Sequence, residues 1–492
     1  MRRVLAWLFF AGVMATLGYS VVRSGVNYQL DIDEFFHAQY VYLVASGSIP
    51  FAYFNVSVYT PLFAWFLLPL GNWLGYTFRV LVAARWLMVM LFAVRIFLSV
   101  IFIRRVFGKT IGWLFLLLFL LDPFTVFAAM QIRPDNLMML LYTAGLLSLS
   151  WAIDRPSVKK FFLTGLFMGI ASLVLMKIVP LTVTVTTLMA FYLLKKKRLN
   201  CLLSYLIGIL VPVLLFAWYG VFTGSLPELV QQLVLDAVLA FSAFRYPVPL
   251  GNFYRPDNIY IYGTMGRPMT WIYAWILLYM AFAGAYHTLI SLFKQGLWRP
   301  ETVIKLIAVV TLVVYQGLLF FLPSVFIQYY LPLGWLYALF AAIALVELFK
   351  ILPRSSLWRG GYLLAVAGFL LTVVYSSVKA NLARAQMTWR EQQRAIEKRW
   401  ENIGGEQTVF PGYLFRPLAH PCMYCYFLYV ADVPQVIKNR YPSIEQVLET
   451  KQVPYVLLSS YSLGLLPAET QAYINTYYRR TTADEELYLR FP

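Results

Sequence analysis

The chain has 492 residues, 61% of them hydrophobic and 13% charged, and its formal net charge is +18. This composition excludes a soluble enzyme and is typical of a protein that crosses a membrane many times. A nucleic-acid partner is excluded as well, because the basic residues do not form one stripe or arm. They lie in short runs between apolar segments, a distribution that sets the orientation of membrane proteins.

Eleven apolar segments are long enough to predict membrane-spanning helices. The first has the basic start of a signal peptide, but its apolar part is long and no small-residue cleavage pattern follows, so we interpret it as a retained span. The segments are residues 4–22, 78–103, 111–127, 137–153, 161–176, 178–194, 201–222, 270–293, 303–322, 329–346 and 361–378.

The charges of the loops predict the orientation of these spans. With the N-terminus inside, the inner loops and their flanks hold 18 lysines and arginines, whereas the outer loops of the membrane part hold five. Short cytoplasmic loops carry most of the basic residues of membrane proteins. We therefore expect a cytoplasmic N-terminus, with residues 23–77, residues 223–269 and everything after residue 378 on the outer side.

The first outer loop carries acidic residues close to the membrane surface. Apolar residues recur at helical spacing over residues 33–47, which places Asp33, Glu34 and His37 in the first turns of a short interfacial helix, with Asp33 and His37 on one face. Carboxylates are costly at such a position and are usually functional. The alternative is that these acids only complement the helix N-terminus.

A lysine is expected at the same level on another pair of helices. Residues 161–194 are too long for one span and barely long enough for two, and both ends are basic. The chain must therefore cross and return, with a turn near Lys177 and Pro180, where proline disrupts the helix. The alternative for Lys177 is a side chain that only extends its ammonium to the interface. Arg85 is the arginine of the second span that we expect to face a polar cavity.

The segments outside the membrane differ in character. The loop of residues 223–269 is long and rich in Tyr, Pro and Gly, carries Arg245, Arg255 and Arg267, and is typical of a lid or a cover over a site. After residue 378 the composition becomes polar and predicts a small α/β domain over residues 379–492, beside a membrane domain over residues 1–378. Its expected elements are a helix over 381–402, strands over 408–411, 455–459 and 487–491, and helices over 444–450 and 469–479.

Cysteine and histidine residues do not predict a metal centre. Three cysteines in so long a chain exclude a disulfide framework. His420, Cys422 and Cys425 lie close together, but one histidine and two cysteines fall short of a four-ligand zinc site. A disulfide between the two cysteines is the alternative for an extracytoplasmic domain.

The motifs that are missing from the sequence restrict the chemistry. There is no GxGxxG, P-loop, HExxH or GxSxG pattern. An enzyme on the outer face has no nucleotide supply, so group transfer there needs a lipid-borne donor, and a polyprenyl-phosphate sugar meets this need. Attack by an acceptor hydroxyl requires a carboxylate base, for which Asp33 or Glu34 is suited, and cations for the departing phosphate, for which Lys177 and Arg133 are suited.

Several short motifs follow one another over residues 1–350. They are Asp33-Glu34-x-x-His37, Gly47-x-Ile-Pro50, Tyr59-Thr-Pro61, Arg133-Pro134-Asp135, Lys177 and Gln328-Tyr329-Tyr330. Together they resemble the bacterial C-type (GT-C) glycosyltransferases related to protein O-mannosyltransferases and the lipid A aminoarabinose transferase. The resemblance implies an all-α polytopic protein of the bacterial inner membrane that transfers a hexose or pentose, with inversion, from a polyprenyl-phosphate sugar to a lipid, glycan or protein acceptor.

The resemblance also assigns site residues. It implies a catalytic acid at Asp33 and Glu34 and a donor phosphate near Lys177, whereas Tyr59 stands where many relatives have a histidine. The candidate substrate-binding residues are His37, Tyr59, Arg85, Arg133, Asp135, Lys177, Arg255, Arg267, Gln328 and Tyr329.

No cofactor is expected, and the fixed cations of the outer face predict activity without added metal. The competing functions are a transporter or flippase of lipid-linked or envelope polysaccharide components and a non-catalytic scaffold. We see no internal repeat of the kind that transporters show.

Overall fold

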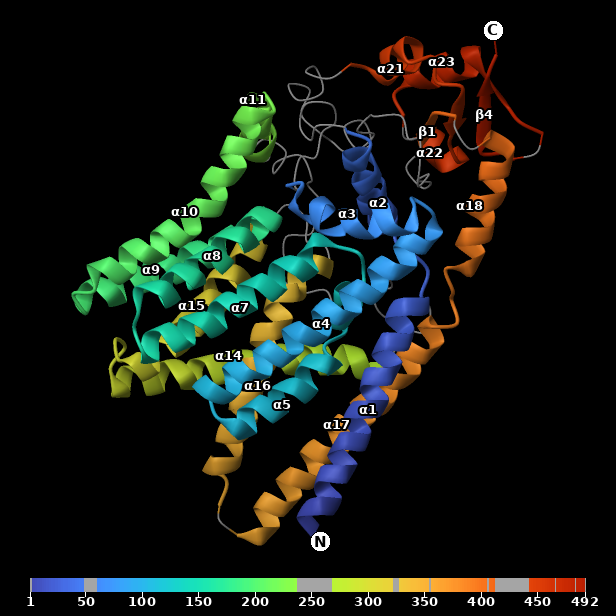
Figure 1. Ribbon diagram of the computed structural model, residues 1–492. Helices are drawn as coiled ribbons and strands as arrows, with labels where there is room; N and C mark the ends of the chain where they lie inside the picture. Colours follow the sequence, from blue (N-terminus) through green and yellow to red (C-terminus); the bar gives the residue numbers. More distant parts are fainter. Residues whose placement is uncertain are drawn as a thin grey trace.

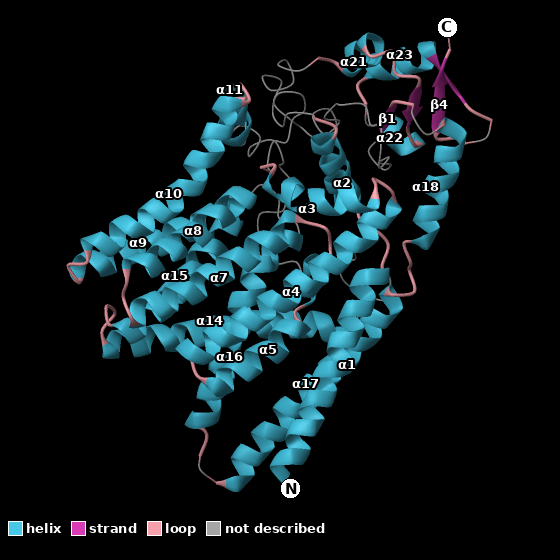
Figure 2. Cartoon of the chain, viewed as in Figure 1, coloured by secondary structure: helices cyan, strands magenta, loops and turns pink. Residues whose placement is uncertain are grey.

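The structure is a computed structural model that describes residues 2–47, 60–236, 268–321, 327–353, 355–404, 407–411, 442–464, 466–482 and 484–491. A large helical part ends in a small domain that contains the C-terminus, and the N-terminus lies at the opposite end (Figure 1). The strands of the described residues belong to that small domain (Figure 2). The expected all-helical membrane part with a small α/β domain is therefore confirmed.

All eleven apolar segments coincide with helices. Within the described residues, nine helices are long and apolar enough to cross a membrane. Two further segments form the shorter helices α5 (Lys109–Leu121) and α8 (Val158–Val174). The others are α1 (Arg2–Asn27), α4 (Phe78–Val106), α7 (Pro134–Asp154), α9 (Val179–Lys195), α10 (Leu199–Phe222), α14 (Pro268–Gln295), α15 (Pro300–Phe321), α16 (Leu331–Ile351) and α17 (Ser356–Arg384).

Short helices connect these spans at the end that carries the C-terminal domain. The turn expected near Lys177 is confirmed, because a short 3-10 helix, η1, separates α8 from α9. The short elements are α2 (Ile32–Ala45), α3 (Leu62–Leu74), α6 (Pro123–Ala129), η1 (Met176–Ile178), α11 (Leu226–Val230), η2 (Gln231–Asp236) and η4 (Ile327–Tyr330).

The third apolar segment is broken, where the sequence predicted one helix over residues 111–127. Asp122 ends α5 and begins α6, because its carboxylate accepts a hydrogen bond from the backbone N–H of Thr125 at 2.8 Å. Pro123 stands at the first position of α6, where the missing N–H costs nothing. A side chain that caps a helix inside an apolar run is the local reason for the break.

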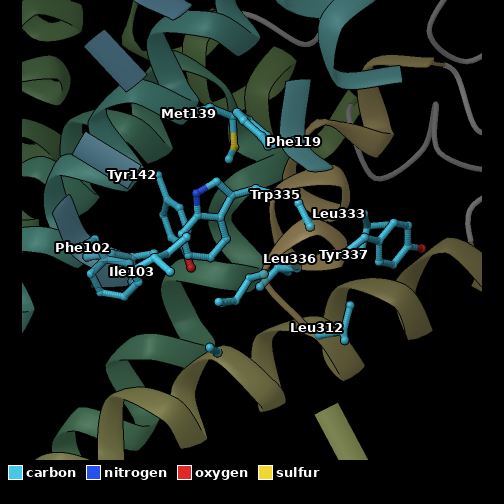
Figure 3. Close-up of a cluster of buried hydrophobic side chains, with 14 of the residues drawn as sticks. Phe102, Ile103, Phe119, Met139, Tyr142, Leu312, Leu333, Trp335, Leu336 and Tyr337 are labelled. Atoms are coloured by element: carbon cyan, nitrogen blue, oxygen red, sulfur yellow. The ribbon is translucent and has the colours of Figure 1, made fainter. Parts of the chain in front are cut away.

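The core of the membrane part is organised around α16. Every residue from 331 to 344 is buried, so this helix is surrounded by others. The Trp335 indole donates a hydrogen bond to the Ser99 hydroxyl at 2.9 Å and packs against Phe102. Figure 3 shows the same indole beside Tyr142 and other apolar side chains of this core. A helix that is apolar on all sides is suited to this central position.

The helices α8 and α10 approach each other closely because of glycines. A Cβ atom added at Gly165 would overlap the backbone carbonyl of Tyr205, and one at Gly208 would overlap the carbonyl of Phe162. Small residues allow such backbone contact between membrane helices, where the hydrophobic effect supplies no driving force. This packing holds α8, the first helix of the hairpin whose turn carries Lys177, against α10.

The C-terminal domain contains a four-stranded sheet with the order β1-β2-β4-β3. The first pair is parallel, with Val409 opposite Tyr455, and the other two pairs are antiparallel. The elements are α18 (Arg390–Ile403), β1 (Val409–Pro411), α21 (Ile444–Thr450), β2 (Tyr455–Leu457), α22 (Ser460–Gly464), α23 (Ala468–Tyr477), β3 (Tyr478–Arg480) and β4 (Leu487–Arg490).

Two details of this domain differ from the sequence prediction. The helix expected over residues 381–402 is interrupted, because α17 ends at Arg384 and α18 begins at Arg390. Residues 478–480, which lay next to or inside an expected helix, form β3, since pairing with β4 outweighs the local helical preference. The other expected strands and helices are confirmed.

Candidate active site

The acidic helix α2 begins with a reciprocal cap. The Asp31 carboxylate accepts from the backbone N–H of Asp33, and the Glu34 carboxylate accepts from the backbone N–H of Asp31 at 2.8 Å. Such a capping box fixes the direction in which the helix starts. The helix expected over residues 33–47 is confirmed as α2, and Glu34 contributes to its N-terminal cap. Its position at the membrane interface stays a prediction.

Glu34 is also held by a buried arginine from α4. Its two carboxylate oxygens accept from the Nε and Nη2 atoms of Arg85, with 2.7 Å between Nε and Oε1, and Oε1 accepts from the backbone N–H of Ile132 at 2.9 Å. The Glu34 side chain has no exposed surface. With the N–H of Asp31, four donors occupy this carboxylate, so none of its lone pairs faces the solvent.

Arg85 is equally occupied. Its Nη1 donates to the carbonyls of Gly25 and Tyr28, both at 2.7 Å, and its Nη2 donates to the carbonyl of Gln29 at 3.0 Å. Together with the two bonds to Glu34, these contacts use the five N–H groups of the guanidinium. The polar partners of Arg85 are therefore Glu34 and the backbone before α2, and they leave no N–H group for a substrate in the polar cavity that the sequence predicted.

Asp33 points to a second arginine and is more accessible. Its Oδ2 lies 2.6 Å from Nη1 of Arg133, and Asp31 Oδ2 lies 3.0 Å from Nη2 of the same guanidinium. Arg133 is buried, whereas 30% of the Asp33 side chain and 34% of the Asp31 side chain are exposed. Gln131 supports this arrangement, because it accepts from Nε of Arg133 at 2.7 Å and donates to Asp31 at 3.1 Å.

His37 lies on the same helix as Asp33 and is almost completely buried. Burial, together with the positive charge of Arg133, lowers the pKa of its imidazole to about 3. Its ring packs edge to face on Phe63, with 5.3 Å between ring centroids. The imidazole is therefore neutral at physiological pH and adds no charge to the site.

Lys177 pairs with Asp135, the residue that follows Arg133-Pro134. The two side chains form an ion pair, and the Lys177 ammonium also donates to the backbone carbonyl of Gln328 at 3.0 Å. It lies 5.1 Å from the ring centroid of Tyr329. Asp135 is buried, and 14% of the Lys177 side chain is exposed. The short segment from Arg133 to Asp135 thus joins the two acids of the first loop to the lysine of the α8–α9 turn.

The structure brings together most of the residues that the sequence singled out. One group of side chains that contact one another or interact electrostatically contains Asp33, His37, Arg133, Asp135 and Lys177, together with Gln328 and Tyr329. They lie at the end that carries the C-terminal domain, because the segment before α2 contacts residues 387–392. Three candidates, Tyr59, Arg255 and Arg267, lie outside the described residues, as do Arg245, His420, Cys422 and Cys425.

Sequence reasoning did not place Gln131 or Asp31 among the site residues. Gln131 carried no signal, because a lone glutamine before a helix has many structural roles. Asp31 was recognisable, since an acid three residues before Glu34 at a helix start fits the capping-box pattern. Among the described residues, no group of three His, Cys, Asp or Glu side chains is arranged to hold a metal ion. Activity without added metal stays a prediction.

No protein-family model and no curated protein matches the chain. Solved structures match over 95% or more of its length. ArnT from Cupriavidus metallidurans bound to undecaprenyl phosphate has a TM-score of 0.60 and 14% identity, over 100% of this chain and 98% of that chain. The apo oligosaccharyltransferase of Archaeoglobus fulgidus has a TM-score of 0.56 and 12% identity, over 95% of this chain and 72% of that chain.

A third structure, AglB from the same archaeon in complex with an inhibitory peptide and a dolichol-phosphate, has a TM-score of 0.55 and 11% identity, over 96% of this chain and 72% of that chain. The chain has a GT-C-like membrane fold. The similarity to C-type glycosyltransferases that the motifs implied is thus confirmed at the level of the fold, while identities this low leave the activity to be argued from the site.

Proposed function

We propose that the chain is a glycosyltransferase that transfers a sugar from a polyprenyl-phosphate donor to an acceptor at the membrane surface. The observation that carries the proposal is the accessible carboxylate of Asp33, held by Arg133 and connected through Asp135 to Lys177. The GT-C-like fold supports the reaction class, and the lipid phosphates bound to ArnT and AglB support the class of donor. The sugar that is transferred, a hexose or a pentose, is the one that this donor carries.

The reaction needs a base for the acceptor hydroxyl and positive charge beside the departing phosphate. The acceptor hydroxyl oxygen attacks the anomeric carbon from the side opposite the phosphate, the bond between that carbon and the phosphate oxygen breaks, and the polyprenyl phosphate leaves with the electron pair. The hydroxyl proton passes to Asp33. Inversion at the anomeric carbon follows from this single displacement. If the acceptor is itself an ionised phosphate, it needs no base, and Asp33 positions it instead.

The basic residues act on the departing phosphate. Lys177 and Arg133 provide two fixed positive charges, and a partly enclosed site strengthens their effect on the charge that develops in the transition state. Their present partners are carboxylates, so a bound phosphate competes with Asp33 and Asp135 for them. Freed from Arg133, Asp33 becomes available as the base when donor is bound.

Glu34 and Arg85 have a supporting role in this proposal. Both are fully occupied by each other and by the backbone. We assign the base to Asp33 alone, and we assign Glu34 and Arg85 to holding the start of α2. The proposed site is therefore narrower than the set of residues that the sequence suggested.

The test is consumption of a labelled polyprenyl-phosphate sugar by the purified protein reconstituted in liposomes, with release of the lipid phosphate as the readout. Asp33→Asn should abolish release, because the amide keeps the volume but accepts no proton. Asp154→Asn is the matched control, since this acid forms an exposed ion pair with Arg105 on another part of the molecule. Movement of the lipid between leaflets without release would identify a flippase, and unchanged release in Asp33→Asn would contradict the proposed base.

A further inference from the structure

The backbone that leads into the acidic helix is held by a side chain of the C-terminal domain. The side-chain oxygen of Gln392 in α18 accepts from the backbone N–H of Leu30 at 2.7 Å, and its amide nitrogen donates to the carbonyl of Leu30 at 3.0 Å. A primary amide carries the same donor and acceptor as a peptide group. Gln392 therefore pairs with Leu30 as a residue of a neighbouring strand would, directly before Asp31.

The residues before Gln392 extend this contact along the chain. The N–H of Gln29 donates to the carbonyl of Met387 at 2.8 Å, and the N–H of Trp389 donates to the carbonyl of Asn27 at 3.2 Å. These bonds resemble a short antiparallel ladder between residues 27–30 and residues 387–389. They also explain why α17 and α18 are separate helices, since this part of the backbone pairs with another segment.

The opposite side of the same segment faces Arg85. The guanidinium accepts no bonds and donates to the carbonyls of Tyr28 and Gln29 as well as to Glu34. Residues 27–30 thus lie between a buried arginine and the start of α18. Backbone groups that are hydrogen-bonded on both sides resist displacement, because moving the segment breaks several of these bonds together.

The other end of α18 is attached to the sheet of the C-terminal domain. Arg399 forms ion pairs with Asp484, at 2.7 Å from Nε, and with Glu486. Between the two ends, Ile396 is buried against the apolar cluster that includes Leu30. The helix therefore connects the sheet to the residue next to the helix cap of α2.

We propose that Gln392 is a positioning residue for the carboxylates of α2, through which the C-terminal domain contributes to the reaction; this inference rests on the proposed function. Gln392 holds Leu30, Leu30 precedes the cap residue Asp31, and the cap determines where Asp33 meets Arg133. Catalysis is sensitive to such placement, since a displacement of about 1 Å of a reacting group costs up to roughly 100-fold in rate.

The test compares Gln392→Ala with Gln393→Ala in the full-length protein. Gln393 is the matched control because it lies on the same helix and its side chain, among the described residues, pairs within that helix, with Glu397 at 2.7 Å. Gln392→Ala should lower kcat by roughly 10-fold to 100-fold and leave KM for the donor within about twofold, since the donor contacts remain. Gln393→Ala should retain the wild-type values of both constants.

Hydrogen exchange supplies a readout that does not depend on turnover. In Gln392→Ala the backbone amides of residues 28–34 should exchange about 10-fold faster than in the wild type, while peptides from α16 remain unchanged. A wild-type kcat in Gln392→Ala, or accelerated exchange spread over the whole molecule, overturns the inference. If the wild type itself consumes no donor, the proposed function fails, and unchanged exchange of residues 28–34 in Gln392→Ala then overturns the role of Gln392 separately.

Discussion

The two neighbouring carboxylates of α2 should respond in opposite ways to the same neutral substitution. Glu34→Gln places an NH2 group among donors from Arg85, Ile132 and the α2 cap, inside a site with no exposed surface. Removal of one partner from a buried ion pair costs about 3–5 kcal/mol. Asp33→Asn changes a side chain that is 30% exposed, where loss of an ion pair costs about 1 kcal/mol or less.

These energies translate into different measurements on the purified protein. With a slope of about 2 °C per kcal/mol, Glu34→Gln should lower Tm by roughly 6–10 °C, and Asp33→Asn by about 2 °C or less. Turnover should show the reverse order once each variant is assayed below its own Tm, with a loss of about 100-fold or more in Asp33→Asn. Asp154→Asn, which removes an exposed ion pair, controls for a general effect of lost charge on Tm.

Equal changes of Tm in the two variants would refute this prediction, because the expected difference in Tm arises from the different burial of the two carboxylates. Wild-type stability of Glu34→Gln would show that the pair with Arg85 does not hold the start of α2. An inactive but stable Glu34→Gln beside an active Asp33→Asn would transfer the role of base to Glu34.

Three further predictions follow from contacts around the site. Lys177→Met should reduce donor affinity and turnover, and it should also lower stability, because it leaves the buried Asp135 carboxylate without its partner. Adding Asp135→Asn removes that unpaired charge, so it should restore stability but not turnover. Burial lowers the pKa of His37 from 6.5 to about 3, so the unfolded chain binds a proton that the folded protein does not, and acid favours unfolding. Between about pH 7.5 and about pH 5 the wild type should therefore lose about 2 kcal/mol of stability, which His37→Asn should retain. The change in Tm between the two pH values measures this loss. Gly334→Ala should lower Tm by several degrees without changing KM, since its Cβ would overlap the side chains of Thr125 and Asp122, and an unchanged Tm would contradict the packing of α16 on α6.

Several features were determined by the sequence alone, because they depend on interactions between residues that are near one another in the chain. Hydropathy located the eleven apolar segments, and basic residues at both ends of residues 161–194 required a turn at Lys177. The helical spacing after Asp31 predicted α2, and the order of short motifs indicated the GT-C resemblance that the fold confirms. Which end faces outward remains a prediction from the loop charges.

The division of roles between neighbouring acids was decided only by the tertiary structure. Glu34 and Asp33 are adjacent in sequence and chemically alike, but Glu34 meets Arg85, 51 residues away, and Asp33 meets Arg133. The capping role of Glu34 was visible locally, whereas its burial was not. A hydrogen bond across 362 residues, between Gln392 and Leu30, connects the C-terminal domain to this helix. Such pairings depend on how helices pack in space, and the properties of a single residue or its neighbours in the chain do not specify them.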